Sequence, residues 1–209
     1  MPAMPHHQPD HEPARDRARH MQQLRAQISA RPAQPLSEAE ARDLQHMREE
    51  EKIARDVYLA LGQRWALPPL HHIPGSEQAH MDAVAWLLEH HGLPDPVQDL
   101  PPGRFHSPAF QTLYHQLIEA GLSSELEAIR VGLLIEELDI VDLQQARERT
   151  QNPVIDAVYD DLERGSRNHL RAFFRHLRRH GAHYTPQHLD AHSFERIALS
   201  GRESCASAA

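Results

Sequence analysis

Glu77 and His80 lie three residues apart in a stretch whose other inward positions are apolar. Positions spaced by three and four share one face of a helix, so both side chains fall on the face of Val84, Leu87 and Leu88. Burying an ionised carboxylate costs several kcal/mol unless a cation or hydrogen bonds compensate it. A metal ion held between helices would offset this cost, because carboxylate oxygen and imidazole nitrogen both bind transition metals.

A carboxylate also occupies an inward position on the preceding long predicted helix. Glu50 shares a helical stripe with Met47 and Ala54. That phase favours Glu50 over Glu49 and Glu51 as the inward member of the three consecutive glutamates. We therefore count Glu50 among the candidate ligands.

Two further long helices place polar groups at inward positions. Glu136 and Asp139 stand three residues apart on the third helix, and His169 lies on the apolar face of the fourth, with Ser166 one turn before it. Carboxylate oxygen with imidazole nitrogen, and no thiolate, suits Fe, Mn or Zn. The joint pattern predicts a metal site with six candidate ligands: Glu50, Glu77, His80, Glu136, Asp139 and His169.

The simpler alternative is that each buried polar group has its own partner. The glutamates would then pair with Arg55, Arg130 or Arg167, and each histidine would be an ordinary hydrogen-bonded core residue. One Glu-x-x-His pair also carries little weight in a chain with 18 histidines, because such pairs arise by chance. The convergence of several polar groups on one predicted core favours a shared metal ion over separate pairs.

Capping and breaking signals divide the chain into helices. Ser37 with Glu40 forms a capping box, Ser107-Pro108 and Asn152-Pro153 open further helices, and glycine or proline ends each long one. We predict four long helices, over residues 37–62, about 75–91, about 124–150 and about 153–180. A Pro-broken connection over 65–75 joins the first two, and a crossover from 93 to about 124, which contains a short helix over 108–121, joins the second to the third. A short segment around Phe194 and Ile197 follows the fourth. Two helical hairpins joined by one long crossover are typical of a ferritin-like four-helix bundle.

Composition agrees with an all-α fold and limits the function. The 209 residues suffice for one domain with tails, and only 5% are aromatic. We expect a disordered or loosely helical arm over residues 1–36, a ferritin-like domain over 37–198 and a disordered tail over 199–209. The net charge of -8 argues against nucleic acid as a partner, and the single cysteine, Cys205, excludes an intrachain disulfide. We find neither a signal peptide nor a membrane segment, and expect a cytoplasmic protein with no membrane partner.

Four ordered blocks, at residues 47–58, 76–83, 132–140 and 165–173, resemble an uncharacterised bacterial and archaeal domain family assigned to the ferritin-like superfamily, whose fold is that of rubrerythrin and ferritin. Together the blocks span roughly residues 36–198. The resemblance implies a ferritin-like four-helix fold. It brings no known reaction with it.

Di-iron members of the superfamily use one glutamate followed by Glu-x-x-His, and repeat this set in the second hairpin. The resemblance implies that Glu50, Glu77 and His80 form the first half. In the second half Glu136 and His169 match, whereas Ser166 stands at the place of the expected glutamate.

Asp139 has one of two roles in a site that has Ser166 in place of this glutamate. It supplies the missing carboxylate from the neighbouring helix, or it holds a ligand histidine by its second nitrogen. A dinuclear site with an altered bridge and a single-metal site both remain open at this point.

The leading hypothesis is a soluble protein that binds one or two transition-metal ions, with iron preferred over Mn or Zn. Its reaction class would be oxidation of Fe(II) or reduction of peroxide or dioxygen, and a homodimer is a candidate assembly. The alternative is a catalytically silent bundle with a mononuclear or structural metal, in which the arm and an arginine row serve a protein partner. That row comprises Arg164, Arg167, Arg171, Arg175 and Arg178. Storage in a hollow shell would need a large assembly, which nothing in the sequence requires.

Overall fold

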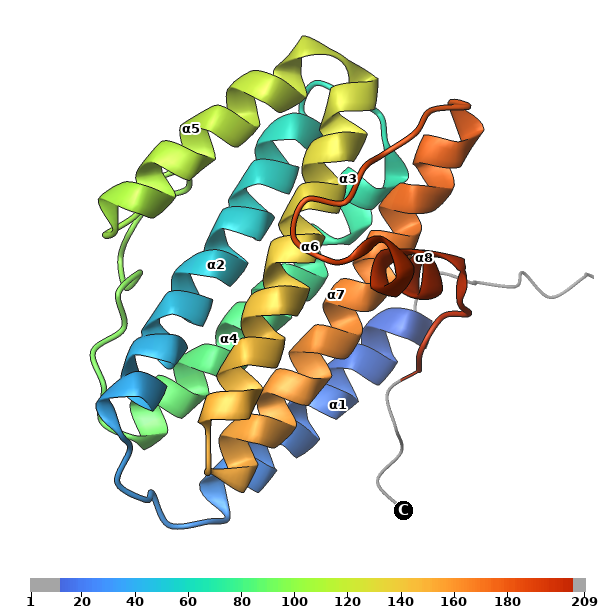
Figure 1. Ribbon diagram of the computed structural model, residues 1–209. Helices are drawn as coiled ribbons and strands as arrows, with labels where there is room; N and C mark the ends of the chain where they lie inside the picture. The colour runs from blue at the N-terminus through green and yellow to red at the C-terminus, as the bar shows by residue number, and fades with distance from the viewer. Residues whose placement is uncertain (1–11, 205–209) are drawn as a thin grey trace, which may run out of the picture.

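The computed structural model describes residues 12–204, and every regular element in that range is a helix (Figure 1). The helices are α1 (Glu12–Ser29), α2 (Glu38–Gly62), α3 (Pro68–His72), α4 (Pro74–His90), α5 (Pro108–Ser123), α6 (Glu125–Arg149), α7 (Pro153–Arg179) and α8 (Ala191–Leu199). The predicted all-α class is thus confirmed. No helix in the described range combines the length and the apolar character that crossing a bilayer requires.

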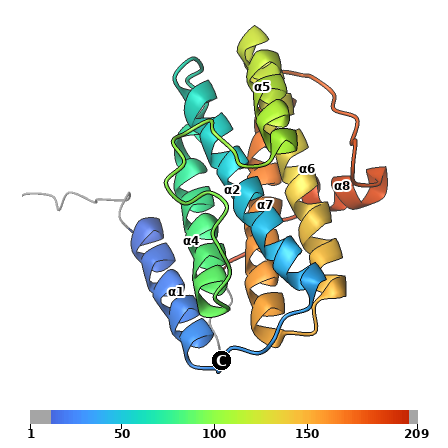
Figure 2. The ribbon, with the colours of Figure 1, turned by 90° about the vertical axis from the view of Figure 1, so that its left-hand side faces the viewer.

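The four long helices α2, α4, α6 and α7 lie side by side (Figures 1 and 2). Helix α2 packs on α4 and α6, and α7 packs on α6 and α4, so each long helix has two long neighbours. Helices α2 and α4 form one hairpin through the short α3, and α6 and α7 form another through residues 150–152. The predicted crossover joins the two hairpins and contains α5, which packs on α2 and α6.

Local hydrogen bonds set the helix boundaries where the sequence predicts them. The Ser37 hydroxyl accepts from the Glu40 backbone N–H while the Glu40 carboxylate accepts from the Ser37 backbone N–H, which is a capping box. Ser107 caps α5, and the Asn152 side chain accepts from two backbone N–H groups at the start of α7. The Pro-broken connection differs from expectation only in containing the single turn of α3.

The apolar core consists of two clusters rather than one. The first gathers Ile53, Val57, Leu133, Phe173 and others, and includes residues of α5 and α8. The second gathers Leu44, Leu87, Leu143, Leu162 and others, and includes residues of α1. On α2 and α7 the two sets of apolar residues are separated along the chain by buried polar residues, such as Glu51 on α2 and Ser166 on α7. A buried polar layer therefore lies between the two apolar clusters on these helices.

Helix α1 departs from the expected disordered or loosely helical arm. It packs on α4 and α7 and buries Leu24 and Ile28. His20 Nε2 lies 2.6 Å from Asp161 Oδ2 on α7, and the Arg25 guanidinium lies over the Trp86 ring at 5.3 Å. These contacts join residues far apart in the sequence, so local patterning does not predict them. The arm's residues 1–11 lie outside the described residues.

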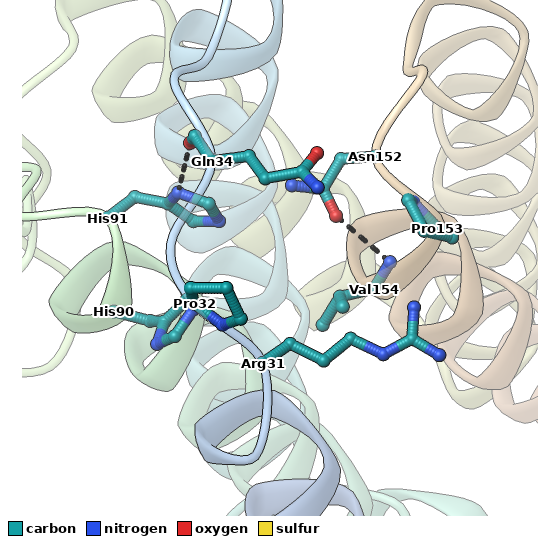
Figure 3. Close-up of a pocket in the computed structure, with 8 residues that line it drawn as sticks. All are labelled: Arg31, Pro32, Gln34, His90, His91, Asn152, Pro153 and Val154. Carbon is teal, nitrogen blue, oxygen red and sulfur yellow. Dashed lines mark hydrogen bonds between the residues drawn. The ribbon is translucent and has the colours of Figure 1, made fainter.

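The connection from α1 to α2 crosses one end of the long helices, where it borders a small pocket (Figure 3). His91 Nδ1 at the end of α4 lies 3.1 Å from the Gln34 carbonyl oxygen in that connection. The start of α7 forms the opposite wall, with Asn152 capping Val154. None of the candidate metal ligands lines this pocket.

The predicted disordered tail also differs from the structure between residues 199 and 204. The Glu203 carboxylate accepts hydrogen bonds from Arg167 and Arg171, and its backbone N–H donates to Asn168. Arg171 is only 4% exposed and also donates to the Ile197 carbonyl oxygen. Two members of the arginine row thus hold the C-terminal segment instead of facing solvent. Residues 205–209 of the predicted tail, with Cys205, lie outside the described residues.

Glu40 should make the stability of the fold depend on pH. Burial opposes ionisation of this carboxylate, but hydrogen bonds from Ser37, Thr150 and the Gln151 backbone N–H lower its pKa to about 2. Because the pKa of Glu40 is lower in the folded state than in the unfolded state, its ionised form stabilises the fold at pH values above the unfolded pKa. This contribution is lost as pH falls toward 2. We expect Glu40→Gln to lower the free energy of unfolding at pH 7 by about 1–2 kcal/mol, as measured by urea denaturation.

The difference between this variant and the wild type should shrink steadily between about pH 5 and about pH 2, where the wild-type carboxylate takes up its proton. Glu38→Gln, in the same first turn but with an exposed side chain, is the matched control and should change little. An equal difference at pH 7 and pH 3 would contradict this role of the Glu40 charge.

Candidate metal centre

Six ionisable side chains meet between the two apolar clusters, and each of the four long helices contributes to the group. Glu77 and Glu136 are 0% exposed, and none of the six exceeds 8%. We call this group the buried centre; its members are Glu51 of α2, Glu77 and His80 of α4, Glu136 and Asp139 of α6, and His169 of α7. Five of the six predicted ligands are thus brought together, and Glu51 replaces Glu50.

Glu77 lies at the middle of the buried centre. Its Oε2 is 3.0 Å from His80 Nδ1, and its Oε1 is 3.0 Å from His169 Nδ1. His80 Nδ1 also lies 3.1 Å from Glu51 Oε2, and His169 Nδ1 lies 3.4 Å from Glu136 Oε2. The result is two three-residue groups of possible metal ligands that share the Glu77 carboxylate.

Hydrogen bonds within the protein leave many atoms of the buried centre unsatisfied. A protonated Nδ1 has one hydrogen to donate, yet each histidine Nδ1 faces oxygens of two carboxylates. Both oxygens of Glu77 lack a hydrogen-bond partner, as do one oxygen each of Glu51, Glu136 and Asp139. Unpaired buried oxygens are rare, and their convergence fits the coordination of a cation.

The spacing of the atoms also fits a shared ion. Oxygen and nitrogen ligands about 2.1 Å from one ion, at tetrahedral or octahedral angles, lie about 3.0–3.4 Å apart. The four contacts between histidine nitrogens and carboxylate oxygens measure 3.0, 3.0, 3.1 and 3.4 Å.

Arginine partners, the simpler alternative, do not occur at this centre. Arg55 donates to Asp56 and Gln78, Arg130 pairs with Glu127, and Arg167 pairs with Glu163 and Glu203. Among the ion pairs of the described residues, none joins a lysine or arginine to a carboxylate of the buried centre.

Tyr58 orients one of the carboxylates. Its hydroxyl donates a 2.6 Å hydrogen bond to Glu136 Oε1, which leaves Oε2 facing His169. The Tyr58 side chain is fully buried on α2, about two turns beyond Glu51, and its ring packs against Phe173. The hydrogen bond therefore fixes which oxygen of Glu136 is available to a metal ion.

Helix α7 approaches His80 of α4 closely because it carries a glycine, Gly165, at the contact. A Cβ at Gly165 would lie 2.6 Å from Cε1 and Nε2 of His80, whose ring stacks on His169 at 5.6 Å. Ser166 is fully buried and donates to the Leu162 carbonyl oxygen at 3.2 Å. Its hydroxyl hydrogen is thus bound within its own helix, at the place where the resemblance led us to expect a glutamate.

Asp139 lies among the other carboxylates of the buried centre. Burial raises its pKa well above the ordinary value, and the charges of Glu51, Glu50, Glu136 and Glu77 raise it further. No hydrogen bond in the described residues joins Asp139 to a histidine, so the structure does not support its holding a ligand histidine. Its position fits the other expectation, that it supplies the carboxylate missing from α7.

The charged groups of the buried centre strongly shift one another's pKa values. Burial alone would raise the pKa of Glu77, but His169 and His80 lower it to about 2. Burial would lower the pKa of His169, but Glu77 and Glu136 raise it to about 10, and burial above all raises the pKa of Glu136 to about 7. Burial would also lower the pKa of His80, but Glu51 and Glu77 raise it well above the ordinary value. The carboxylates thus favour the protonated form of both histidines, and a metal ion must displace a proton from each in order to bind.

The three consecutive glutamates of α2 point to three different places. Glu49 accepts from the Ser107 backbone N–H at the start of α5, Glu50 faces α6, and Glu51 faces His80. Successive residues of a helix differ by about 100° in direction, so Glu50 and Glu51 both fall within the inward sector. The spacing of three and four residues fits both glutamates, since Met47, Ala54 and Leu61 are buried together with Tyr58 on the Glu51 side and with Val57 on the Glu50 side.

Residues 40–201 match the family described as "Uncharacterized protein domain (DUF2202)". The chain belongs to this family. It is 49% identical over 176 residues to "Uncharacterized protein MJ0754" of Methanocaldococcus jannaschii, which covers 84% of this chain and 95% of that protein. The crystal structure of hypothetical protein MJ0754 from Methanococcus jannaschii DSM 2661 is similar with a TM-score of 0.81 and 48% identity, over 83% of this chain and 99% of that one. The buried centre of this DUF2202 protein lies wholly within the matched range.

Gly165 should be required for metal binding because it makes room for His80. We expect Gly165→Ala to push the His80 ring out of place and to weaken binding of Zn(II) to metal-stripped protein by at least about tenfold. Zinc affinity is measured by competition with a chromophoric chelator. Ser166→Ala, the neighbouring control, should keep wild-type affinity, since its hydroxyl is bonded to its own helix. Equal affinities for the two variants would refute the steric role of Gly165.

Asp139 should destabilise the metal-free protein. The pKa of Asp139 is higher in the folded state than in the unfolded state, so its ionisation destabilises the fold at pH values above the unfolded pKa. This destabilisation grows as pH rises toward the folded-state pKa. We expect Asp139→Asn to stabilise metal-stripped protein at pH 8 by about 0.5–2 kcal/mol while weakening metal binding. Thermal unfolding at pH 4 and pH 8 checks this, and a gain that is larger at pH 4 would contradict it.

Proposed function

We propose that this protein is a ferritin-like four-helix bundle that binds two transition-metal ions, with iron as the preferred metal, at the buried centre. The observation that carries the proposal is the shared Glu77 carboxylate, each of whose oxygens lies 3.0 Å from a different histidine nitrogen. A carboxylate placed in this way can bridge two ions. The two hairpins and the helix-containing crossover support the ferritin-like assignment.

The ligands divide naturally between two ions. Glu51 and His80 would hold one ion, Glu136 and His169 the other, with Glu77 between them. Asp139 would add the fourth carboxylate. Four ionised carboxylates carry four negative charges, which two divalent ions neutralise while both histidines are neutral. A single divalent ion would neutralise only two of them, so two carboxyl groups would have to stay protonated and would bind metal poorly. A dinuclear site uses all four carboxylates as ligands, despite Ser166.

The reaction class follows from the metal and its surroundings. Two Fe(II) ions would supply the two electrons needed to reduce one hydrogen peroxide, with two protons, to two water molecules, or would begin the reduction of dioxygen. Tyr58 holds a proton beside the site: burial raises the pKa of its hydroxyl well above the ordinary value, and the hydroxyl donates a hydrogen bond to Glu136. The apolar clusters on both sides keep bulk water away from the ions.

A structural metal is the second candidate. It is favoured by the burial of all six side chains, because structural metal sites are closed whereas catalytic ones keep an open position. The related idea of a protein-interaction role has less support, since α1 packs on the long helices and Arg167 and Arg171 bind Glu203. The two candidates differ in whether the bound metal reacts with an oxidant.

An iron titration separates these candidates. Metal-stripped protein is titrated with Fe(II) without oxygen, and dioxygen or peroxide is then admitted while the near-ultraviolet and visible spectrum is recorded. We expect two irons per chain and a charge-transfer band of oxidised iron. One iron per chain, or none with the helices intact, would overturn the dinuclear proposal; two irons inert to both oxidants would support a structural site.

If Glu77 bridges two ions, replacing it should reduce the amount of bound iron. Glu77→Gln keeps the shape but removes the charge, so we expect at most one iron per chain, bound at least about tenfold more weakly. Glu49→Gln is the matched control, because Glu49 is also a buried glutamate but accepts its hydrogen bond from Ser107 outside the centre. Metal content measured by elemental analysis checks both variants. Unchanged metal content and thermal stability in Glu77→Ala and His80→Ala would refute the site altogether.

A further inference from the structure

A second group of possible metal ligands lies where α2 and α6 meet the surface. His46 Nε2 is 3.3 Å from Asp142 Oδ2 and 3.6 Å from Glu50 Oε2. The side chains of His46 and Asp142 are 48% and 33% exposed, whereas that of Glu50 is 6% exposed. We call these three residues the outer group. These two distances are close to the separation of about 3.0–3.4 Å that is expected between two ligand atoms of one ion.

Glu50 gives an independent sign that the outer group takes a cation. The residue is 4% exposed, and its Oε2, which faces His46, has no hydrogen-bond partner. A buried carboxylate oxygen without a partner is costly, and here the open side of that oxygen is the side toward the other two ligands. A cation bound there would satisfy it.

The outer group is held in place and open to solvent. The His46 ring packs against Phe110 of α5, with ring centroids 4.9 Å apart. His46 and Asp142 line a surface depression, whose rim also carries Arg42 and Arg149. Both arginines are paired with carboxylates, Arg42 with Glu38 and Arg149 with Asp43, so the cationic rim is largely neutralised. An ion can therefore reach the outer group directly from solution.

Carboxylates connect the outer group to the buried centre. Glu50 is the chain neighbour of Glu51, and Asp142 lies one helical turn after Asp139 on α6. Asp139 lies near both groups, because its carboxylate interacts electrostatically with Glu51 and Glu77 of the buried centre and with Glu50 of the outer group. Oxygen ligands thus follow one another from the surface to the interior along the contact between α2 and α6.

We propose that His46, Glu50 and Asp142 form a second divalent-cation site, which captures transition-metal ions from solution and passes them by way of Asp139 to the buried centre. The capture site stands on its own geometry, while its delivery role rests on the proposed function of the buried centre. With three ligands and partial exposure, it should bind more weakly than the buried centre and exchange its ion readily.

Mn(II) is the probe for capture, because free Mn(II) has a strong paramagnetic resonance signal that is lost on binding. We expect metal-stripped wild-type protein to bind three Mn(II) ions per chain and His46→Ala/Asp142→Asn to bind two. His180→Ala/Glu125→Gln removes another surface histidine and carboxylate, 3.2 Å apart, and should still bind three. Broadening of the His46 ring signal by Mn(II) in nuclear magnetic resonance locates the weakest ion. Equal Mn(II) numbers in the wild type and His46→Ala/Asp142→Asn would overturn the capture site.

Stopped-flow loading with Fe(II) tests delivery. We expect His46→Ala/Asp142→Asn to reach the wild-type iron content of the buried centre at least about tenfold more slowly, and the control variant to load at the wild-type rate. An unchanged loading rate would overturn delivery. The two proposals fail separately: Mn(II) binding that is lost in His46→Ala/Asp142→Asn but kept in Glu77→Gln upholds the outer site, even if the iron titration rules out the buried centre.

Discussion

The ionised Glu77 carboxylate, held out of water between two histidines, is the constraint on which the rest of the structure depends. Its pKa of about 2 means that it keeps its charge at 0% exposure, which only nearby positive charge can sustain. The two histidines come from different helices, so α4 and α7 must stay in register for Glu77 to lie 3.0 Å from both of them. Gly165 then becomes necessary, because any larger residue on α7 would displace the His80 ring.

The division of the apolar core into two clusters follows from the same constraint. The buried polar layer interrupts the apolar residues along α2 and α7, and the loss must be offset by apolar packing on either side. Helix α5 adds Phe110 and Leu117 to one cluster, and α1 adds Leu24 and Ile28 to the other. The helices outside the central four thus enlarge the two apolar layers that the polar layer separates.

Local chemistry made most of the fold predictable. The helix boundaries at Ser37, Ser107 and Asn152 were predicted because caps and prolines act over three or four residues. The docking of α1 was not, since it depends on contacts such as His20 with Asp161, 141 residues away in the chain. The binding of Glu203 by Arg167 was missed for the same reason.

The candidate site was predictable to within one helical residue. Glu77, His80, Glu136 and His169 stand on faces that are otherwise apolar, so their inward direction can be read from the sequence alone. The choice between Glu50 and Glu51 could not be made in this way, because both lie within the inward sector of α2. Only the positions of α4 and α6 around α2 decide that Glu51 meets His80 while Glu50 meets His46.

The run of three glutamates is therefore more than a solvated charge cluster. Because each residue turns by about 100°, Glu49 reaches the crossover, Glu50 the surface group with His46, and Glu51 the buried centre. One turn of α2 thus ties together the start of α5, the surface and the interior. Shifting this turn by one residue would misplace all three contacts at once, so the geometry of the centre and that of the fold constrain each other.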